Sequence, residues 1–327
     1  DEVPAGNLAF ITGLADVLAG DTLVAPELHG MEPLDRLQMP TEPVVTYTVE
    51  PKMLRDLSTI QKPIMDFVRS DPALEFTVNP DTGEMLLSGA GELHIEIATE
   101  KLRRIGVEIQ LGRPVVVIKE QMTRDGPLCE GGGPETSRFS ARAVLSRPDL
   151  SGHTGNVLDS EPRSDCHLID STGTIDPKSQ EAQWVREAFR TAINRGPKRG
   201  ERMRGVTVII ESAEVRLESE EMSWRDITQP LLDAIRASIC GGQPELVQPW
   251  ARLEISSPEE HVGTVTAILM RRKGRVLEMD SERTLYRIEA ELPVSESFGL
   301  ANELRTATSG WATWGARPGE YRPLGNG

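Results

Sequence analysis

Apolar and polar positions follow two kinds of pattern along this chain, and the order of these patterns repeats once. Residues 44–49 are mostly β-branched, which is typical of a strand. A helix is predicted next, because apolar residues then recur every three or four positions: Leu54, Leu57, Ile60, Ile64 and Phe67. Short strands follow around Phe76 and Leu86, then a helix over about 92–105 and a strand ending near Ile118. The order β-α-β-β-α-β predicts a split βαβ, ferredoxin-like module.

The same order returns near the end of the chain. Strands are predicted over 252–255, 276–279, 286–292 and 311–315, and helices over 262–269 and 298–308. The chain therefore contains two similar modules that flank a middle region.

The middle region, 120–248, follows a different pattern. A helix with one apolar face is predicted around Trp184, a long strand over 206–217 and a second helix over about 230–240. Glycines at 131–133 predict a hinge. The fold class is thus α+β and multidomain.

Short apolar runs separated by turns occupy residues 1–39, which is the pattern of the last hairpins of a small β-barrel. A Pro-Thr-Glu-Pro linker follows at 40–43. Because the chain begins at Asp1, inside what is predicted to be a folded segment, we expect it to be a piece of a longer protein.

Composition and charge exclude several classes of function. The 327 residues carry 51 acidic and 36 basic side chains, a net charge of −15, whereas a general nucleic-acid binder is basic. The three cysteines show no metal-ligand spacing, and no run of about 18 apolar residues predicts a membrane span. The sequence contains no GxxxxGK[ST] loop and no catalytic constellation, so we expect neither an enzyme nor a cofactor in this chain.

One short motif lies between a predicted strand and a predicted helix. Ser88, Gly89, Gly91, Glu92 and His94 form a Gly-x-Gly turn that leads into the helix. Such a turn leaves helix N–H groups free for an anion, but glycine serves strand-to-helix turns structurally more often. A base role for His94 is conceivable, although a packed or hydrogen-bonded histidine is commoner.

The stretch Leu-Leu-Ser-Gly-Ala-Gly-Glu-Leu-His-Ile-Glu at 86–96 resembles the domain III signature of the translation elongation factor 2 family of archaea and eukaryotes. Stretches at 5–22, 204–217 and 293–310 resemble parts of its domains II, IV and V, in the family's order. The resemblance implies the end of a domain II β-barrel at 1–39, a ferredoxin-like domain III at 40–119 and a ferredoxin-like domain V at 249–327. Domain IV, at 120–248, would be like domain 2 of ribosomal protein S5.

The resemblance also implies a function and partners. A GTPase domain that binds GTP and Mg²⁺ precedes these domains in the family, and domain IV reaches the decoding site during translocation. We therefore expect a cytoplasmic, monomeric chain that binds ribosomal RNA and ribosomal proteins, with tRNA as a further candidate partner, without contact to a membrane.

The tip of domain IV departs from the family. Ser223 stands, within one residue, where the family carries the histidine that is modified to diphthamide, and no histidine lies nearby. The predicted contact residues of this tip are Glu218, Ser219, Glu220, Glu221, Met222, Ser223, Trp224, Arg225 and Asp226. Their four acids and one base give a net charge of −3, which opposes binding to phosphates. A second tip loop, 132–137, lacks the basic residues of the family, and Trp224 is expected to pack under its own loop.

Three functions stay open from the sequence. The first is the C-terminal part of a diverged elongation-factor-2-like translational GTPase. The second is a binding module, outside translation or in ribosome assembly or rescue, that uses the acidic arm for a protein partner. The third is an ordinary elongation factor that works without diphthamide.

Overall fold

The computed structural model of the chain describes most of its residues. They are 2–11, 17, 21–28, 30–31, 34, 43–51, 57–71, 73–78, 83–133, 137–146, 155–215, 224–282 and 284–324. Within them no helix is long and apolar enough to cross a membrane.

The first module has the predicted split βαβ fold. Its elements are β1 (Val45–Pro51), α1 (Leu57–Val68), β2 (Glu75–Val78), β3 (Met85–Gly89), α2 (Glu92–Arg104) and β4 (Ile109–Val116). The strands form an antiparallel sheet in the order β2-β3-β1-β4. Alternate residues of β1 and β3 are buried, as expected when helices cover one face of a sheet.

The last module repeats this architecture. Its elements are β12 (Pro244–Pro258), α5 (Glu259–Arg271), β13 (Arg275–Glu282), β14 (Leu285–Pro293), η4 (Val294–Glu296), α6 (Leu300–Ala307) and β15 (Thr313–Pro323). Strand β12 lies between β15 and β14, and β13 is at the far side of β14, which is the strand order of the first module. The two ferredoxin-like modules predicted from the hydrophobic pattern are therefore confirmed.

The middle module is a sheet covered by two helices. Its elements are β5 (Lys119–Met122), β6 (Cys129–Gly131), β7 (Arg138–Leu145), β8 (Asn156–Glu161), β9 (Cys166–Asp170), α3 (Gln180–Asn194), β10 (Met203–Arg204), β11 (Val206–Glu214) and α4 (Arg225–Gly241). Five of the strands form a sheet in the order β6-β7-β11-β9-β8. Helices α3 and α4 pack against each other, and their buried apolar faces share one core with the sheet.

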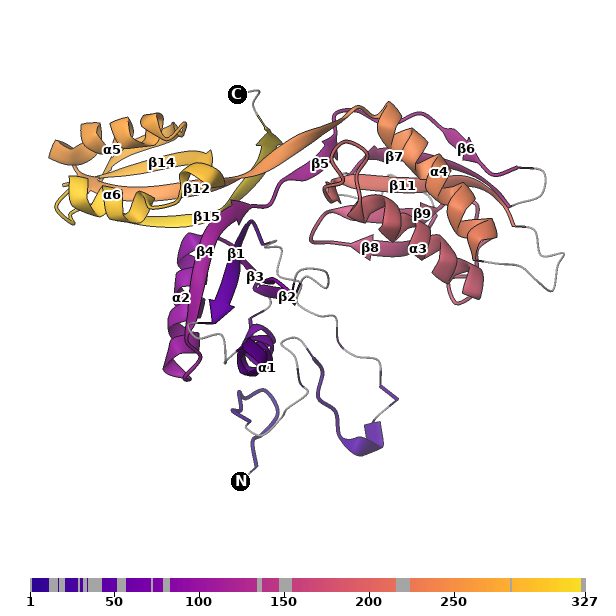
Figure 1. Ribbon diagram of the computed structural model, residues 1–327, viewed down its shortest axis with the longest axis horizontal. Helices are drawn as coiled ribbons and strands as arrows, with labels where there is room; N and C mark the ends of the chain where they lie inside the picture. The colour runs from indigo at the N-terminus through magenta and orange to yellow at the C-terminus, as the bar shows by residue number, and fades with distance from the viewer. Residues whose placement is uncertain are drawn as a thin grey trace.

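Two strands connect the middle module to the last one. Strands β5 and β10 belong to the sheet of the last module, where β5 pairs with the first residues of β12. Figure 1 shows the last and middle modules on opposite sides of the molecule, joined by the long strand β12, with the first module beside the last one. Buried residues of the first and last modules form one continuous hydrophobic cluster.

The barrel hairpins predicted at 1–39 lie partly outside the described residues and stay a prediction. The described residues of this segment contain one 3-10 helix, η1 (Pro26–Leu28), and no strand. Leu8 and Phe10 are 101% and 94% exposed, so their apolar side chains have no packing partner here. A hairpin without a third strand or a helix to pack against is at best marginally stable.

The glycines at 131–133 were predicted to form a hinge, but Gly131 makes a close packing contact in the structure. Gly131 is the last residue of β6, which pairs with β7. A Cβ atom at Gly131 would lie 1.9 Å from the carbonyl oxygen of Pro230 in α4. This glycine therefore allows a helix to pack closely on a sheet, which is a fixed contact.

Candidate functional site

The turn between β3 and α2 contains the motif predicted in the first module. Ala90 donates its backbone N–H to Nδ1 of His94 over 3.1 Å, and Nε2 of His94 lies 3.1 Å from a carboxylate oxygen of Asp71. Because Nδ1 accepts a hydrogen bond, the ring proton is on Nε2, which donates to Asp71. The Ser88 hydroxyl bonds to that of Thr46 on the neighbouring strand at 2.7 Å. His94 and Ser88 thus fix the turn in place, and these contacts indicate a structural role.

The contact with His94 makes the stability of the first module sensitive to acid. Burial raises the pKa of Asp71, but hydrogen bonds from His94 and from the N–H of Ala73 outweigh burial, so the pKa lies below its usual value. A carboxyl group with a lowered pKa stabilises the fold above its unfolded pKa of about 3.9, and this contribution is lost as the pH falls through the folded value. We expect Asp71→Asn to lower the unfolding temperature of the first module at about pH 7, with a difference from wild type that shrinks below about pH 4.

Calorimetric scans at decreasing pH measure that difference. The matched control is Asp66→Asn, because Asp66 makes only an exposed contact with Arg69 at 3.5 Å. If the difference in unfolding temperature between Asp71→Asn and wild type stays constant down to about pH 2.5, the stabilising role of the Asp71 carboxylate is contradicted.

The same turn is attached to the last module by Glu92. The two carboxylate oxygens of Glu92 accept the backbone N–H of Gly299 at 3.0 and 3.3 Å. Within the last module, the Arg272 guanidinium donates to the carbonyl oxygens of Glu296 and Phe298 at 2.6 and 2.9 Å. The turn before α6 is thus held by its own module and by the first module. We call the pair of Glu92 and Gly299 the interface latch.

An apolar contact lies next to the interface latch. The rings of Tyr47 and Phe298 meet edge to face, with centroids 6.5 Å apart. Burial raises the pKa of Tyr47 to about 12, and the carboxylates of Glu92 and Glu96 contribute to this rise. A pocket of about 290 Å³ is lined by both modules, with residues that include Ile97, Leu253 and Trp314. The two modules thus meet through the interface latch, the ring contact and the hydrophobic cluster that they share, beside an unfilled pocket.

Protein groups disfavour the anion site that the Gly-x-Gly turn allows. The N–H of Ala90 is bonded to His94 and is therefore not available to an anion. The carboxylate of Glu92, at the first position of α2, adds negative charge where an anion would bind. The contacts of this turn therefore favour an interface role.

Residues 224–226 of the predicted tip lie in the middle module, which takes no part in the interface latch. Residues 218–223 lie outside the described residues. Of the others, Trp224 precedes α4, and Arg225 and Asp226 begin that helix. The Trp224 side chain is 47% exposed, with the Arg225 guanidinium 5.6 Å from its ring centroid. The structure therefore places the two predicted sites on different modules.

Two other features of the chain bear on metals and redox chemistry. Among the described residues, no group of three or more His, Cys, Asp or Glu side chains is arranged to hold a metal ion. Cys129, Cys166 and Cys240 are free thiols, and burial raises the pKa of Cys166 to about 11.

Sequence reasoning did not identify Gly299, Arg272 or the ring pair as parts of the site. Gly299 lies 207 residues from Glu92 in the sequence, and no local pattern marks it as a partner. The available signal was the Ser-Phe-Gly turn at 297–299, which the sequence analysis used only for the family resemblance.

The two ferredoxin-like modules coincide with the two segments of the chain that match family models of elongation factors. Residues 40–113 match the family described as elongation factor G, domain III, and residues 245–326 match the family described as elongation factor G C-terminus. The chain is homologous to the C-terminal, non-GTPase part of elongation factor 2.

The similarity extends over nearly the whole chain. Elongation factor 2 of Aeropyrum pernix is 33% identical and that of Staphylothermus marinus 31%, each over 99% of this chain and 48% of the relative. The chain thus spans about half the length of the curated relatives it matches. A solved structure from Thermus thermophilus has the same fold, with a TM-score of 0.60 at 23% identity, over 90% of this chain and 42% of that one.

Proposed function

We propose that this chain is the ribosome-binding part of a translocation-type factor like elongation factor 2, acting in the cytoplasm. The observation that supports this most is the interface latch, since it joins the domain III turn to the C-terminal module that is homologous to elongation factors. In this proposal the first and last modules contact the ribosome, and the middle module projects as an arm toward tRNA. GTP and Mg²⁺ would bind outside these modules, and the chain itself holds no cofactor and works as a monomer.

The proposal includes an altered tip on the arm. The acidic residues at 218–226 would face RNA less favourably than a basic tip, because like charges repel. This observation also supports a second candidate function, in which the acidic arm engages a basic protein partner during ribosome assembly or rescue, or outside translation.

Ribosome binding at increasing salt tests the proposal. We expect the chain to co-sediment with ribosomes at moderate salt. The triple variant Glu218→Gln, Glu220→Gln and Glu221→Gln should bind roughly 10-fold more tightly if the tip faces RNA, because three repulsive charges are removed. Sedimentation assays with quantified bound fractions measure both effects.

The control removes three negative charges from the last module with Glu259→Gln, Glu278→Gln and Asp280→Asn. Each variant loses three of the 51 acidic charges, which changes the net charge from −15 to −12. Only a gain in ribosome affinity that is confined to the tip variant therefore supports a tip that faces RNA. Absence of sedimentation by the wild-type chain would count against the ribosome-binding proposal. Loss of binding in the tip variant would favour the second candidate function.

A further inference from the structure

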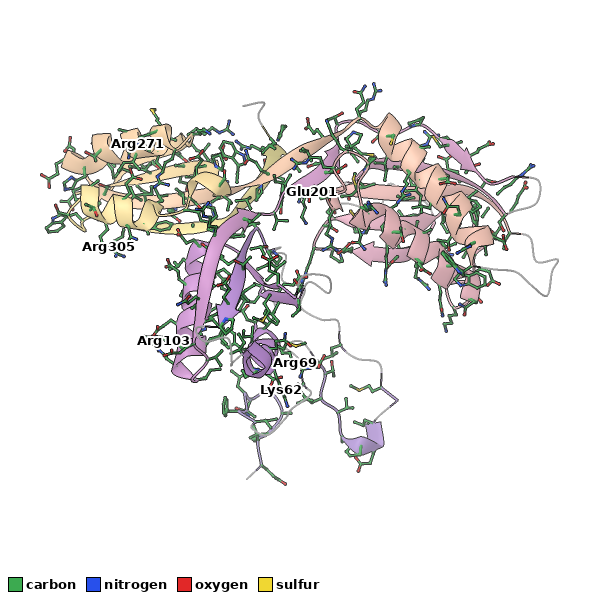
Figure 2. The ribbon with its side chains drawn as sticks, in the orientation of Figure 1. Lys62, Arg69, Arg103, Glu201, Arg271 and Arg305 are labelled. Atoms are coloured by element: carbon green, nitrogen blue, oxygen red, sulfur yellow. The ribbon has the colours of Figure 1, made fainter. Side chains whose placement is uncertain are left out.

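Positive charge is concentrated after helix α3, in a chain whose net charge is −15. Residues 195–204 contain five basic side chains and one acidic side chain, a net charge of +4. The segment connects α3 to β10, beside the strands that join the middle and last modules. Figure 2 labels Glu201 of this segment at that junction.

The loop is held by a buried carboxylate. Glu120 on β5 is 0% exposed, and its side chain accepts the backbone N–H groups of Lys198, Arg199 and Glu201 at 2.8, 2.7 and 3.2 Å. A Cβ atom at Gly196 would lie 2.5 Å from this carboxylate, so glycine allows the close approach. The backbone that carries the basic side chains is therefore fixed before any partner binds.

Three cations of the loop lie at the surface of the protein. Arg195, Lys198 and Arg199 are exposed. In the part of the chain that the structure describes, neither Arg195 nor Arg199 pairs with a carboxylate, and Lys198 Nζ lies 3.4 Å from the carbonyl oxygen of Pro244. By contrast, Arg202 pairs with Glu161 at 2.6 Å.

The basic run of the last module, residues 271–275, provides a comparison, because its cations are paired with carboxylates. Arg271 and Arg272 both pair with Glu303, and Lys273 pairs with Glu296 at 3.0 Å. Arg275 pairs with Glu291. Both runs have exposed cations, but the cations of the last module are paired with carboxylates, whereas Arg195 and Arg199 form no such pair among the described residues.

A shallow groove extends from the loop along α3. It has a volume of about 510 Å³ and a lining of Gln183, Arg186, Glu187, Arg190, Thr191, Asn194 and Arg195. Arg190 pairs with Asp159 at 2.7 Å, and the lining contains a single acid, Glu187. None of the lining residues is aromatic, although Trp and Tyr are enriched, together with Arg, at the hot spots of protein–protein interfaces.

We propose that Arg195, Lys198 and Arg199, together with this groove, bind the phosphate backbone of ribosomal RNA; we call them the α3 basic surface. This inference rests on the proposed ribosome function and names a contact for it at the base of the arm. Guanidinium and ammonium groups bind phosphates, while amides and hydroxyls suit sugar and phosphate oxygens. Such contacts position a protein on RNA without reading its sequence.

The test is the triple variant Arg195→Gln, Lys198→Gln and Arg199→Gln in the 327-residue chain. One probe is intact ribosomes, and the other is a fluorescein-labelled RNA hairpin with a stem of about 16 base pairs. We expect affinity for both to fall roughly 10- to 100-fold near 0.1 M salt. The slope of log affinity against log salt should decrease by about 2, because each phosphate contact contributes about 0.7–0.9. The Glu120 contacts use backbone groups, so the variant keeps its loop.

The matched control is Lys62→Gln, Arg113→Gln and Arg305→Gln, which brings the net charge to the same −18 from exposed positions elsewhere. Hairpin binding that is equal in the loop variant and wild type would overturn the inference, as would absence of hairpin binding by wild type. Equal or tighter binding of a poly-glutamate peptide would overturn it in favour of an acidic protein segment. The loop variant could lose hairpin binding while the wild-type chain does not bind ribosomes. That result would support RNA binding by the α3 basic surface and contradict the proposed function.

Discussion

Replacing Glu120 by alanine is expected to lower the free energy of unfolding of the middle module by about 3–5 kcal/mol. The carboxylate accepts three backbone N–H groups from the loop after α3, at 2.7–3.2 Å, and it is fully buried. Hydrogen bonds to a charged group contribute about 1.5–3 kcal/mol each, and alanine leaves the donors without their acceptor. The same change should release the loop that carries Lys198 and Arg199, and thereby weaken RNA binding by the α3 basic surface.

Two variants separate this role from a general loss of charge. Glu120→Gln keeps the size of the side chain but places an amide N–H₂ group against an N–H donor, so its cost should be intermediate. Glu201→Ala removes a carboxylate from the same loop and should change stability by less than about 0.5 kcal/mol. Urea unfolding gives the stability, and hydrogen exchange of the Lys198 and Arg199 amides gives the local effect. Unchanged amide protection in Glu120→Ala would contradict the role of this carboxylate.

The repeated module fold could be predicted because local patterns determine it. In β1, Val45, Tyr47 and Val49 are buried and alternate with less buried residues, so the strand is visible in the sequence. Strand β15 was predicted over 311–315 but spans Thr313–Pro323, since its pairing with β12 is a backbone interaction that glycine and proline side chains do not reveal. Strand β9, which is parallel to β11 and antiparallel to β8, was missed for a related reason, because all five of its residues are buried and none alternates.

The polar contacts of the site could be predicted only in part. The turn before α2 was identified from its glycines and His94, because that motif is contiguous in sequence. Glu120 was not identified, since a carboxylate gives no sequence signal of burial and its first partner, Lys198, is 78 residues away. Polar contacts between distant segments depend on the tertiary fold, whereas hydrophobic periodicity does not.

The second large effect is expected from a substitution in the interface latch. Replacing Glu92 by alanine is expected to shift the equilibrium between docked and separated first and last modules by about 1.5–3 kcal/mol, or roughly 10- to 100-fold toward separation. The carboxylate bonds to Gly299 in the other module, next to the ring contact of Tyr47 with Phe298 and the hydrophobic cluster that the two modules share. Because the first module is homologous to domain III, this shift would change how that domain is positioned relative to the C-terminal module.

Energy transfer between dyes on the two modules measures the separation. Lys62 on the first module and Arg305 on the last module are exposed, and both are labelled in Figure 2. Each would be replaced by cysteine after Cys129 and Cys240 are changed to serine.

An alkaline titration of Tyr47 supplies a second, independent measurement. Its pKa, raised to about 12 by burial and by the carboxylates of Glu92 and Glu96, should fall toward about 10 when the modules separate. The control is Glu96→Ala, which removes a charge near Tyr47 without touching Gly299, so the pKa should fall slightly while energy transfer stays at the wild-type value. If energy transfer in Glu92→Ala also stays at the wild-type value, the apolar contact alone holds the modules together and the latch has no role in their positioning.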